Sequence, residues 1–104
     1  MRLGALEAGG TKMVCAIGDE LGNIESRASF PTRKPEETMP DIIGFFADQK
    51  IEALGVGSFG PLSLDPESSD FGAITTTPKL EWRSFPLRKS LADALNVPVG
   101  IDTD

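Results

Sequence analysis

The sequence predicts one α/β domain with a mixed sheet, in the order β-β-β-α-β-α-β. Two observations carry this prediction. Three strand-like runs joined by short glycine-containing turns open the chain, and such a succession is typical of an antiparallel meander. After them, amphipathic helical patterns alternate with short apolar runs. A strand that is reached through a helix is expected to pair in parallel with its predecessor.

Three strands are expected in the meander, at residues 3–7, 13–17 and 24–30. The turn between the first two contains Gly9 and Gly10. A Gly-Gly pair between strands is a common hairpin signal, because both central residues of such a turn often need positive φ. Residues 18–23 supply the second turn, since glycine, aspartate and asparagine tolerate tight-turn conformations.

The first helix is expected to begin beside Pro40, because a proline inside a helix costs about 3 kcal/mol. Residues 35–37 then form an earlier, irregular turn. Apolar residues at spacings of three to four predict the buried face, which consists of Ile42, Ile43, Phe46 and Ala47. Residues 51–57 follow as a short apolar strand, a candidate parallel partner of the first strand.

Residues 62–86 form a long irregular segment with too many large apolar groups for a disordered linker. We expect this segment to be ordered and to lie on the side of the domain where a substrate would bind. A short strand is expected at residues 72–75. The second helix begins at Ser84 or Phe85 and ends at Asn96 and Pro98. The last strand is expected at residues 97–101.

Composition excludes several functions. The net charge of −6, with no concentrated basic face, argues against nucleic acid as a partner. No apolar run approaches the roughly 18 residues of a membrane span, and no signal peptide opens the chain, so we expect a cytoplasmic protein. Cys15 is the one cysteine and histidine is absent. An internal disulfide, a Cys/His zinc site and any histidine-dependent triad are therefore excluded.

The turn at residues 9–12 is the first candidate site. Glycines let a ligand approach the backbone, while Thr11 adds a hydroxyl and Lys12 an ammonium, which together suit a phosphate group. The alternative is a plain Gly-Gly hairpin with a solvent-facing lysine. The turn is not a P-loop, since the glycine-spaced loop that opens a helix is absent.

Two further stretches are candidate site elements, each with an alternative. The loop at residues 57–61 follows a predicted parallel strand, where ligands tend to bind, but it also reads as a structural turn. Trp82, near Lys79, suits either a pocket wall or a buried anchor beneath the long segment.

The chain ends with two carboxylates, Asp102 and Asp104, directly after the last predicted strand. The carboxyl end of a parallel strand suits a general base. A natural domain seldom ends there, so we expect the chain to be a fragment. The element order matches the first half of the actin-like or RNase H-like two-domain architecture, in which nucleotide and substrate meet between the halves.

Four stretches taken together carry a family resemblance: LEAGGTKMVCAIGD, GVGSFGPLSLDP, GAITTTPKLEWRSFPL and ALNVPVGIDTD. Over essentially its whole length the chain resembles the N-terminal (small) domain, residues 1–104, of a ROK-family sugar kinase, most closely the fructokinase branch. This resemblance implies ATP- and Mg²⁺-dependent phosphorylation of a hexose. The C-terminal domain is absent from this chain.

The resemblance also implies roles for individual residues. The family's phosphate motif falls on four residues that would hold the ATP phosphates: Gly9, Gly10, Thr11 and Lys12. Glu7 stands where the family usually has aspartate, and would orient hydrated Mg²⁺. Asp104 aligns with the catalytic base, which accepts the proton of the attacking sugar hydroxyl.

On the sugar side, the resemblance implies contacts from Gly60, Lys79 and Trp82. Lys79 replaces the asparagine of glucose kinases, which points to fructose, although mannose and other hexoses stay open. Zinc and homodimer contacts are implied for the missing half only. Two alternatives remain, a sugar-binding regulatory protein of the same family and an isolated folded fragment without activity. Repressors of this family carry a helix-turn-helix before the kinase-like domain, whereas this chain begins with the first strand.

Overall fold

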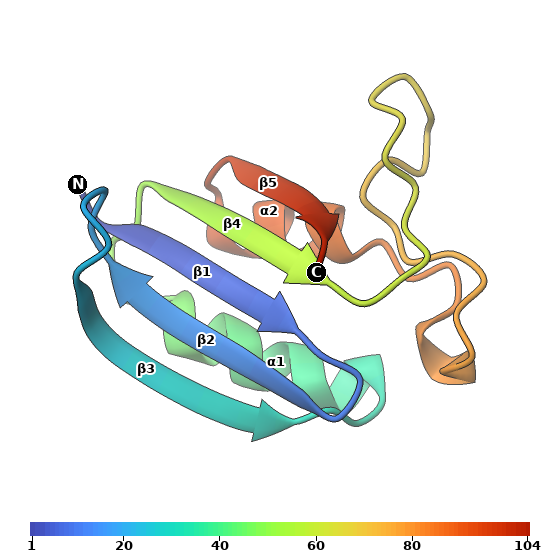
Figure 1. Ribbon diagram of the computed structural model, residues 1–104, viewed down its shortest axis with the longest axis horizontal. Helices are drawn as coiled ribbons and strands as arrows, with labels where there is room; N and C mark the ends of the chain where they lie inside the picture. Colours follow the sequence, from blue (N-terminus) through green and yellow to red (C-terminus); the bar gives the residue numbers. More distant parts are fainter.

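The computed structural model describes residues 1–104 and contains one five-stranded mixed sheet in the order β3-β2-β1-β4-β5 (Figure 1). The elements follow one another as β1 (Leu3–Ala8), β2 (Lys12–Gly18), β3 (Ile24–Pro31), α1 (Pro35–Phe46), β4 (Ala53–Ser58), the 3₁₀ turn η1 (Leu80–Trp82), α2 (Leu87–Leu95) and β5 (Val99–Thr103). β1, β2 and β3 pair antiparallel, while β4 pairs in parallel with β1 and β5 with β4. The predicted mixed sheet and element order are therefore confirmed.

Both helices cover the same face of the sheet, with α1 behind the meander and α2 behind β4 and β5 (Figure 1). Alternate residues of each strand point into this layer, as the period of two in a strand requires. The resulting core contains sixteen buried apolar residues, among them Leu6, Cys15, Ile42, Val56 and Leu91. None of the helices has the length and apolar character that crossing a bilayer requires.

The opposite face of the sheet carries small side chains. One row across it consists of Ala16, Ala5, Gly55 and Gly100, which are paired in register on β2, β1, β4 and β5. The next row, toward the carboxyl ends of the parallel strands, contains Glu7, Gly57 and Asp102. Glu7 and Asp102 are exposed. On β1, β4 and β5 this face therefore carries small side chains, with exposed carboxylates toward the carboxyl ends of the parallel strands.

The start of α1 differs from the prediction. The helix begins at Pro35, so Pro40 lies inside it and residues 35–37 form its first turn. Pro40 is exposed, so the carbonyl of Glu36, which loses its partner, also lies in an exposed turn. A buried stripe explains why the helix persists: Pro35, Thr38, Met39, Ile42 and Phe46 all face the core, whereas Ala47 is exposed.

Other elements also differ from the prediction, and β4 begins at Ala53, two residues later than expected. The expected strand at residues 72–75 is reduced to a single bridge between Leu62 and Ile74. α2 begins at Leu87, later than predicted, and ends as expected at Asn96, whose φ is 55°. β5 covers Val99–Thr103, two residues further on than predicted. A shift of two residues keeps the same side chains on the core face, so the packing pattern is unaffected.

Cys15 is fully buried in β2. Burial raises the pKa of its thiol to about 12, because a thiolate is poorly solvated in the core. The thiolate is the reactive form, so this cysteine is chemically inert in the folded chain.

We therefore expect Cys15 to be protected from an aromatic disulfide reagent at pH 8 in native buffer, and to react stoichiometrically within minutes in concentrated urea. The pKa of a free thiol, about 8.5, is restored on unfolding, which raises the thiolate fraction by about three powers of ten. Release of the coloured thiol measures the reaction. Rapid labelling of the native chain would show that β2 is not packed as described.

Two strand glycines allow a matched test of the helix-covered face. A Cβ on Gly4 would lie 2.9 Å from the Cδ1 atoms of Ile51 and Leu54, whereas a Cβ on Gly55 would meet nothing within 4 Å. We expect Gly4→Ala to lower the free energy of unfolding by about 1–3 kcal/mol through overpacking. Gly55→Ala, which only restricts the unfolded chain, should be neutral or stabilise by about 0.5–1 kcal/mol. Urea denaturation measures both, and equal effects would contradict the assignment of the two faces.

Candidate functional site

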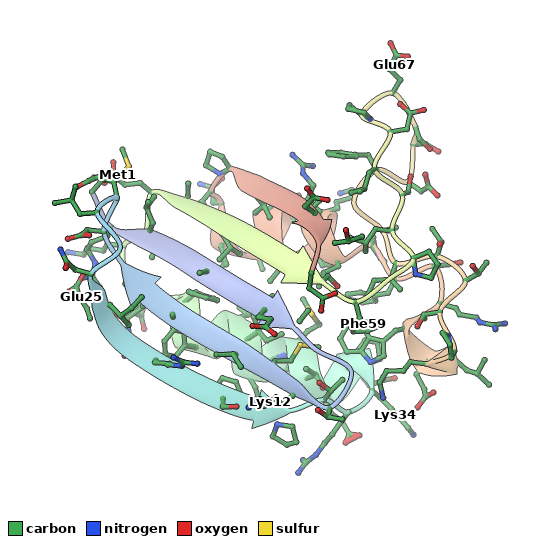
Figure 2. All side chains as sticks on the ribbon, viewed as in Figure 1. Met1, Lys12, Glu25, Lys34, Phe59 and Glu67 are labelled. Carbon is green, nitrogen blue, oxygen red and sulfur yellow. The ribbon has the colours of Figure 1, made fainter.

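The site elements meet at the edge of the sheet where the parallel strands end. The β1–β2 hairpin, the loop after β4 and the end of β5 lie there, and Lys12, Lys34 and Phe59 mark this end of the molecule in Figure 2. Two backbone hydrogen bonds join the elements: the N–H of Phe59 donates to the carbonyl of Ala8 at 2.9 Å, and that of Asp104 to the carbonyl of Ser58 at 3.0 Å. Parallel pairing therefore brings the predicted phosphate hairpin and the predicted base to one edge.

The hairpin closes through the N–H of Gly9, which donates to the carbonyl of Lys12 at 3.0 Å. Neither Gly9 nor Gly10 has positive φ, so the expected conformational reason for the Gly-Gly pair is wrong here. Close approach explains Gly9 instead. A Cβ at this position would lie 2.7 Å from the Lys12 carbonyl oxygen, which is closer than real Cβ contacts.

The hydrogen-bonding pattern of the hairpin leaves donors free. The amides of Gly10 and Thr11 donate no hydrogen bond within the protein. The carbonyl groups beside them are occupied by Thr32, whose hydroxyl donates to Gly9 at 2.8 Å and whose N–H donates to Thr11 at 2.9 Å. The Gly10 carbonyl between them accepts no hydrogen bond, so the turn presents two adjacent unbonded amides, a group that can bind an anion.

Thr32 was not among the residues predicted from the sequence. It lies just after β3 and contacts a glycine 23 positions earlier in the chain. No local pattern signals such a contact, since it depends on the register of β2 and β3. Its two hydrogen bonds make it the residue that holds the hairpin in place.

Two lysines near the hairpin carry charges that no carboxylate of the chain pairs with. Lys12 is exposed and forms no ion pair, and neither does Lys79. The three ion pairs of the chain join Met1 to Glu20, Arg2 to Glu25 and Lys89 to Asp93, away from this edge. The ammonium groups near the hairpin are therefore available to a ligand.

Asp104 is exposed at the end of β5, next to Gly57 of β4. A Cβ on Gly57 would lie 3.8 Å from the Cβ of Asp104, so the glycine keeps the space beside this carboxylate open. Glu7 and Asp102 lie in register on either side of Gly57. No group of three carboxylates, cysteines or histidines is placed to hold a metal by itself.

Trp82 is a buried anchor, one of the two alternatives open at the sequence level. Its side chain is 1% exposed, and its indole N–H donates to the carbonyl of Arg33 at 2.8 Å. The ring makes edge-to-face contacts with Phe59 and Phe85, with centroid distances of 5.9 and 5.2 Å. The bond to Arg33 ties the predicted sugar-side segment to the strand end that also holds the hairpin.

Lys79 and Gly60 occupy different parts of this edge. Lys79 is half-buried and its side chain reaches the hairpin, where its Cε lies 3.3 Å from the position that a Cβ on Gly10 would take. Gly60 precedes Pro61 in the loop after β4, and their peptide bond is cis. The Cγ2 of Thr103 lies 3.9 Å from the position of a Cβ on Gly60, so this loop contacts the end of β5.

Three antiparallel strands followed by two parallel ones, in the order β3-β2-β1-β4-β5, form the mixed sheet expected of the actin-like fold. Residues 3–104 match the model of the ROK family. The chain belongs to the ROK family.

Two relatives illustrate the match. The chain is 45% identical over 104 residues to a fructokinase of Pediococcus pentosaceus, covering 100% of this chain and 36% of the relative. It is 44% identical over 101 residues to a fructokinase of Lactococcus lactis subsp. cremoris, covering 97% of this chain and 35% of the relative. The chain thus spans about a third of the length of these relatives.

Solved structures show the same fold. A ROK family protein from Streptococcus pneumoniae in complex with sucrose superposes with a TM-score of 0.81 at 18% identity, over 100% of this chain and 35% of the other. A ROK family glucokinase from Streptomyces griseus in complex with glucose and AMPPNP superposes with a TM-score of 0.77 at 21% identity. The match covers 99% of this chain and 33% of the glucokinase chain. The predicted actin-like fold is confirmed.

We expect Trp82→Phe to lower the free energy of unfolding by about 1–3 kcal/mol. The substitution leaves the carbonyl of Arg33 without its donor and replaces the indole by a smaller ring. The exposed neighbour Leu80 provides the matched control, and Leu80→Ala should change stability by less than about 0.5 kcal/mol. Chemical denaturation followed by circular dichroism measures both. A stability unchanged by Trp82→Phe would contradict the anchor role.

Proposed function

We propose that the parent protein transfers the γ-phosphoryl group of ATP to a hydroxyl of a hexose, with fructose as the preferred acceptor, and that this chain supplies its N-terminal small domain. One observation carries the proposal. The hairpin presents two unbonded amides, at Gly10 and Thr11, at the same sheet edge as the exposed carboxylate of Asp104. A phosphate-binding group and a proton acceptor therefore face the same region.

The residues divide the work of phosphoryl transfer. The hairpin amides and Lys12 bind phosphate oxygens and offset their charge. Asp104 accepts the proton of the sugar hydroxyl as that oxygen attacks phosphorus. Mg²⁺ bound with the nucleotide supplies further neutralisation of phosphate charge, and Glu7 would hold one of its waters. The remaining parts of a closed site, which exclude water, would come from the part of the relatives' length that this chain does not cover.

Similarity supports the choice of substrate. The relatives at 44–45% identity are fructokinases, and Lys79 replaces the asparagine of glucose kinases. A structural neighbour described as a ROK family transcriptional regulator has a TM-score of 0.75 at 12% identity, so the fold alone does not separate kinases from regulators. The free hairpin amides and Asp104 favour the kinase. A cytoplasmic location, a homodimer and a zinc site outside this chain stay predictions.

In the full-length protein we expect Asp104→Asn to reduce hexose-dependent ADP release by about 10²–10⁴ while hexose affinity stays nearly constant, because a general base is lost without changing the size of the side chain. A coupled assay with fructose, mannose and glucose measures turnover, and calorimetry measures sugar binding.

Asp102→Asn is the matched control, since Asp102 lies two residues earlier in the chain, within β5, and is also exposed. It should retain at least about a tenth of the turnover. A larger loss in this variant than in Asp104→Asn would transfer the role of base to Asp102. Unchanged turnover in both variants would refute the proposed base altogether.

A further inference from the structure

We propose that Lys79 binds the phosphoryl group that is being transferred, so that it is a catalytic residue of the kinase reaction as well as part of the sugar-side segment. This inference rests on the proposed function and deepens it. The resemblance assigns this position to sugar recognition, whereas the structure places the side chain against the phosphate hairpin.

The position of the side chain is the first argument. The Cε atom of Lys79 lies 3.3 Å from the place that a Cβ on Gly10 would occupy, so the methylene next to the ammonium packs on the turn itself. Gly10 and Thr11 are the residues whose amides are free. An anion bound by these amides therefore lies next to the Lys79 ammonium, and glycine at position 10 leaves the space that the lysine uses.

The backbone of Lys79 is held on both sides, which is the second argument. Its N–H donates to the hydroxyl of Thr77 at 3.3 Å, and its carbonyl accepts from the N–H of Trp82 at 2.9 Å. Thr77 and Trp82 are each 1% exposed. Trp82 is in turn bound to Arg33, which directly follows the Thr32 that holds the hairpin. The lysine and the turn that it reaches thus belong to one connected unit.

Charge is the third argument. Lys79 forms no ion pair in the chain, although acidic residues outnumber basic ones by 16 to 10. Lys79 is half-buried as a residue, and its ammonium, which has no carboxylate partner, is available for an anionic ligand. A neutral sugar hydroxyl could only accept a hydrogen bond from the Lys79 ammonium. A phosphoryl group would also be attracted by the positive charge of the ammonium.

In the chemical step Lys79 would stabilise negative charge without exchanging a proton. The sugar oxygen forms a bond to the γ-phosphorus, the bond from that phosphorus to the bridging oxygen of ADP breaks, and the hydroxyl proton moves to Asp104. Lys79 keeps its own proton throughout. Its ammonium donates to a non-bridging oxygen, where charge is spread in the transition state, and this position favours the transition state over bound ATP.

The test compares Lys79→Met, Lys79→Arg and the control Lys89→Met in the full-length protein, with Mg²⁺-ATP and fructose as probes. Lys89 lies on α2, exposed, with Asp93 as its partner. We expect Lys79→Met to lower kcat by about 10²–10³, as for loss of one donor to a developing anion, while KM and the calorimetric Kd for fructose change less than about threefold. Lys79→Arg should recover part of kcat, and Lys89→Met should match the unsubstituted protein.

The outcomes separate the two proposals. A raised fructose KM with unchanged kcat in Lys79→Met would show recognition of the sugar alone and overturn the catalytic role. No effect on either constant would overturn it as well, and both results leave the kinase assignment intact. Absence of turnover in the unsubstituted full-length protein with every hexose would overturn the proposed function and this role together. Circular dichroism of each variant establishes that the fold is retained.

Discussion

The parallel pairing of β4 with β1 is the constraint on which the rest of the structure depends. It places the end of β4 beside the start of the hairpin, and β5 then adds to the outer side of β4. Three chain segments that are far apart in sequence consequently end at one edge. The hydrophobic layer under α1 and α2 supports this pairing, because Leu6 and Val56 face it from neighbouring strands.

Hydrogen bonds from the segment after β3 fix the position of the candidate site on the sheet. Two consecutive residues after β3 connect the parts of the candidate site. The Thr32 hydroxyl donates to the Gly9 carbonyl of the hairpin, and the Arg33 carbonyl accepts from the indole N–H of Trp82. The carbonyl groups of Gly9 and Thr11 are occupied, while the amides of Gly10 and Thr11 donate no hydrogen bond. We expect groups that are positioned in this way to need little reorganisation when an anion binds.

The sequence indicated a large part of this site, and for identifiable reasons. The hairpin at residues 9–12 and the carboxylate at Asp104 follow strands whose period is clear in the sequence, so their place in the fold could be inferred. The start of α1 was misjudged, because burial of Met39 and Ile42 outweighs the cost of an exposed Pro40. The positive φ expected for Gly9 and Gly10 was also wrong, since their turn needs close approach instead.

Taken alone, the sequence determined the mixed sheet, the order of its elements, the family and the chemistry that residues 9–12 and Asp104 suggest. These depend on local periodicity and on short motifs, which a linear chain displays directly. Only the tertiary structure decided that Thr32 holds the hairpin, that Trp82 is a buried anchor and that Lys79 reaches Gly10. Such contacts join residues tens of positions apart, and they exist only once the strands are in register and the long segment is packed against them.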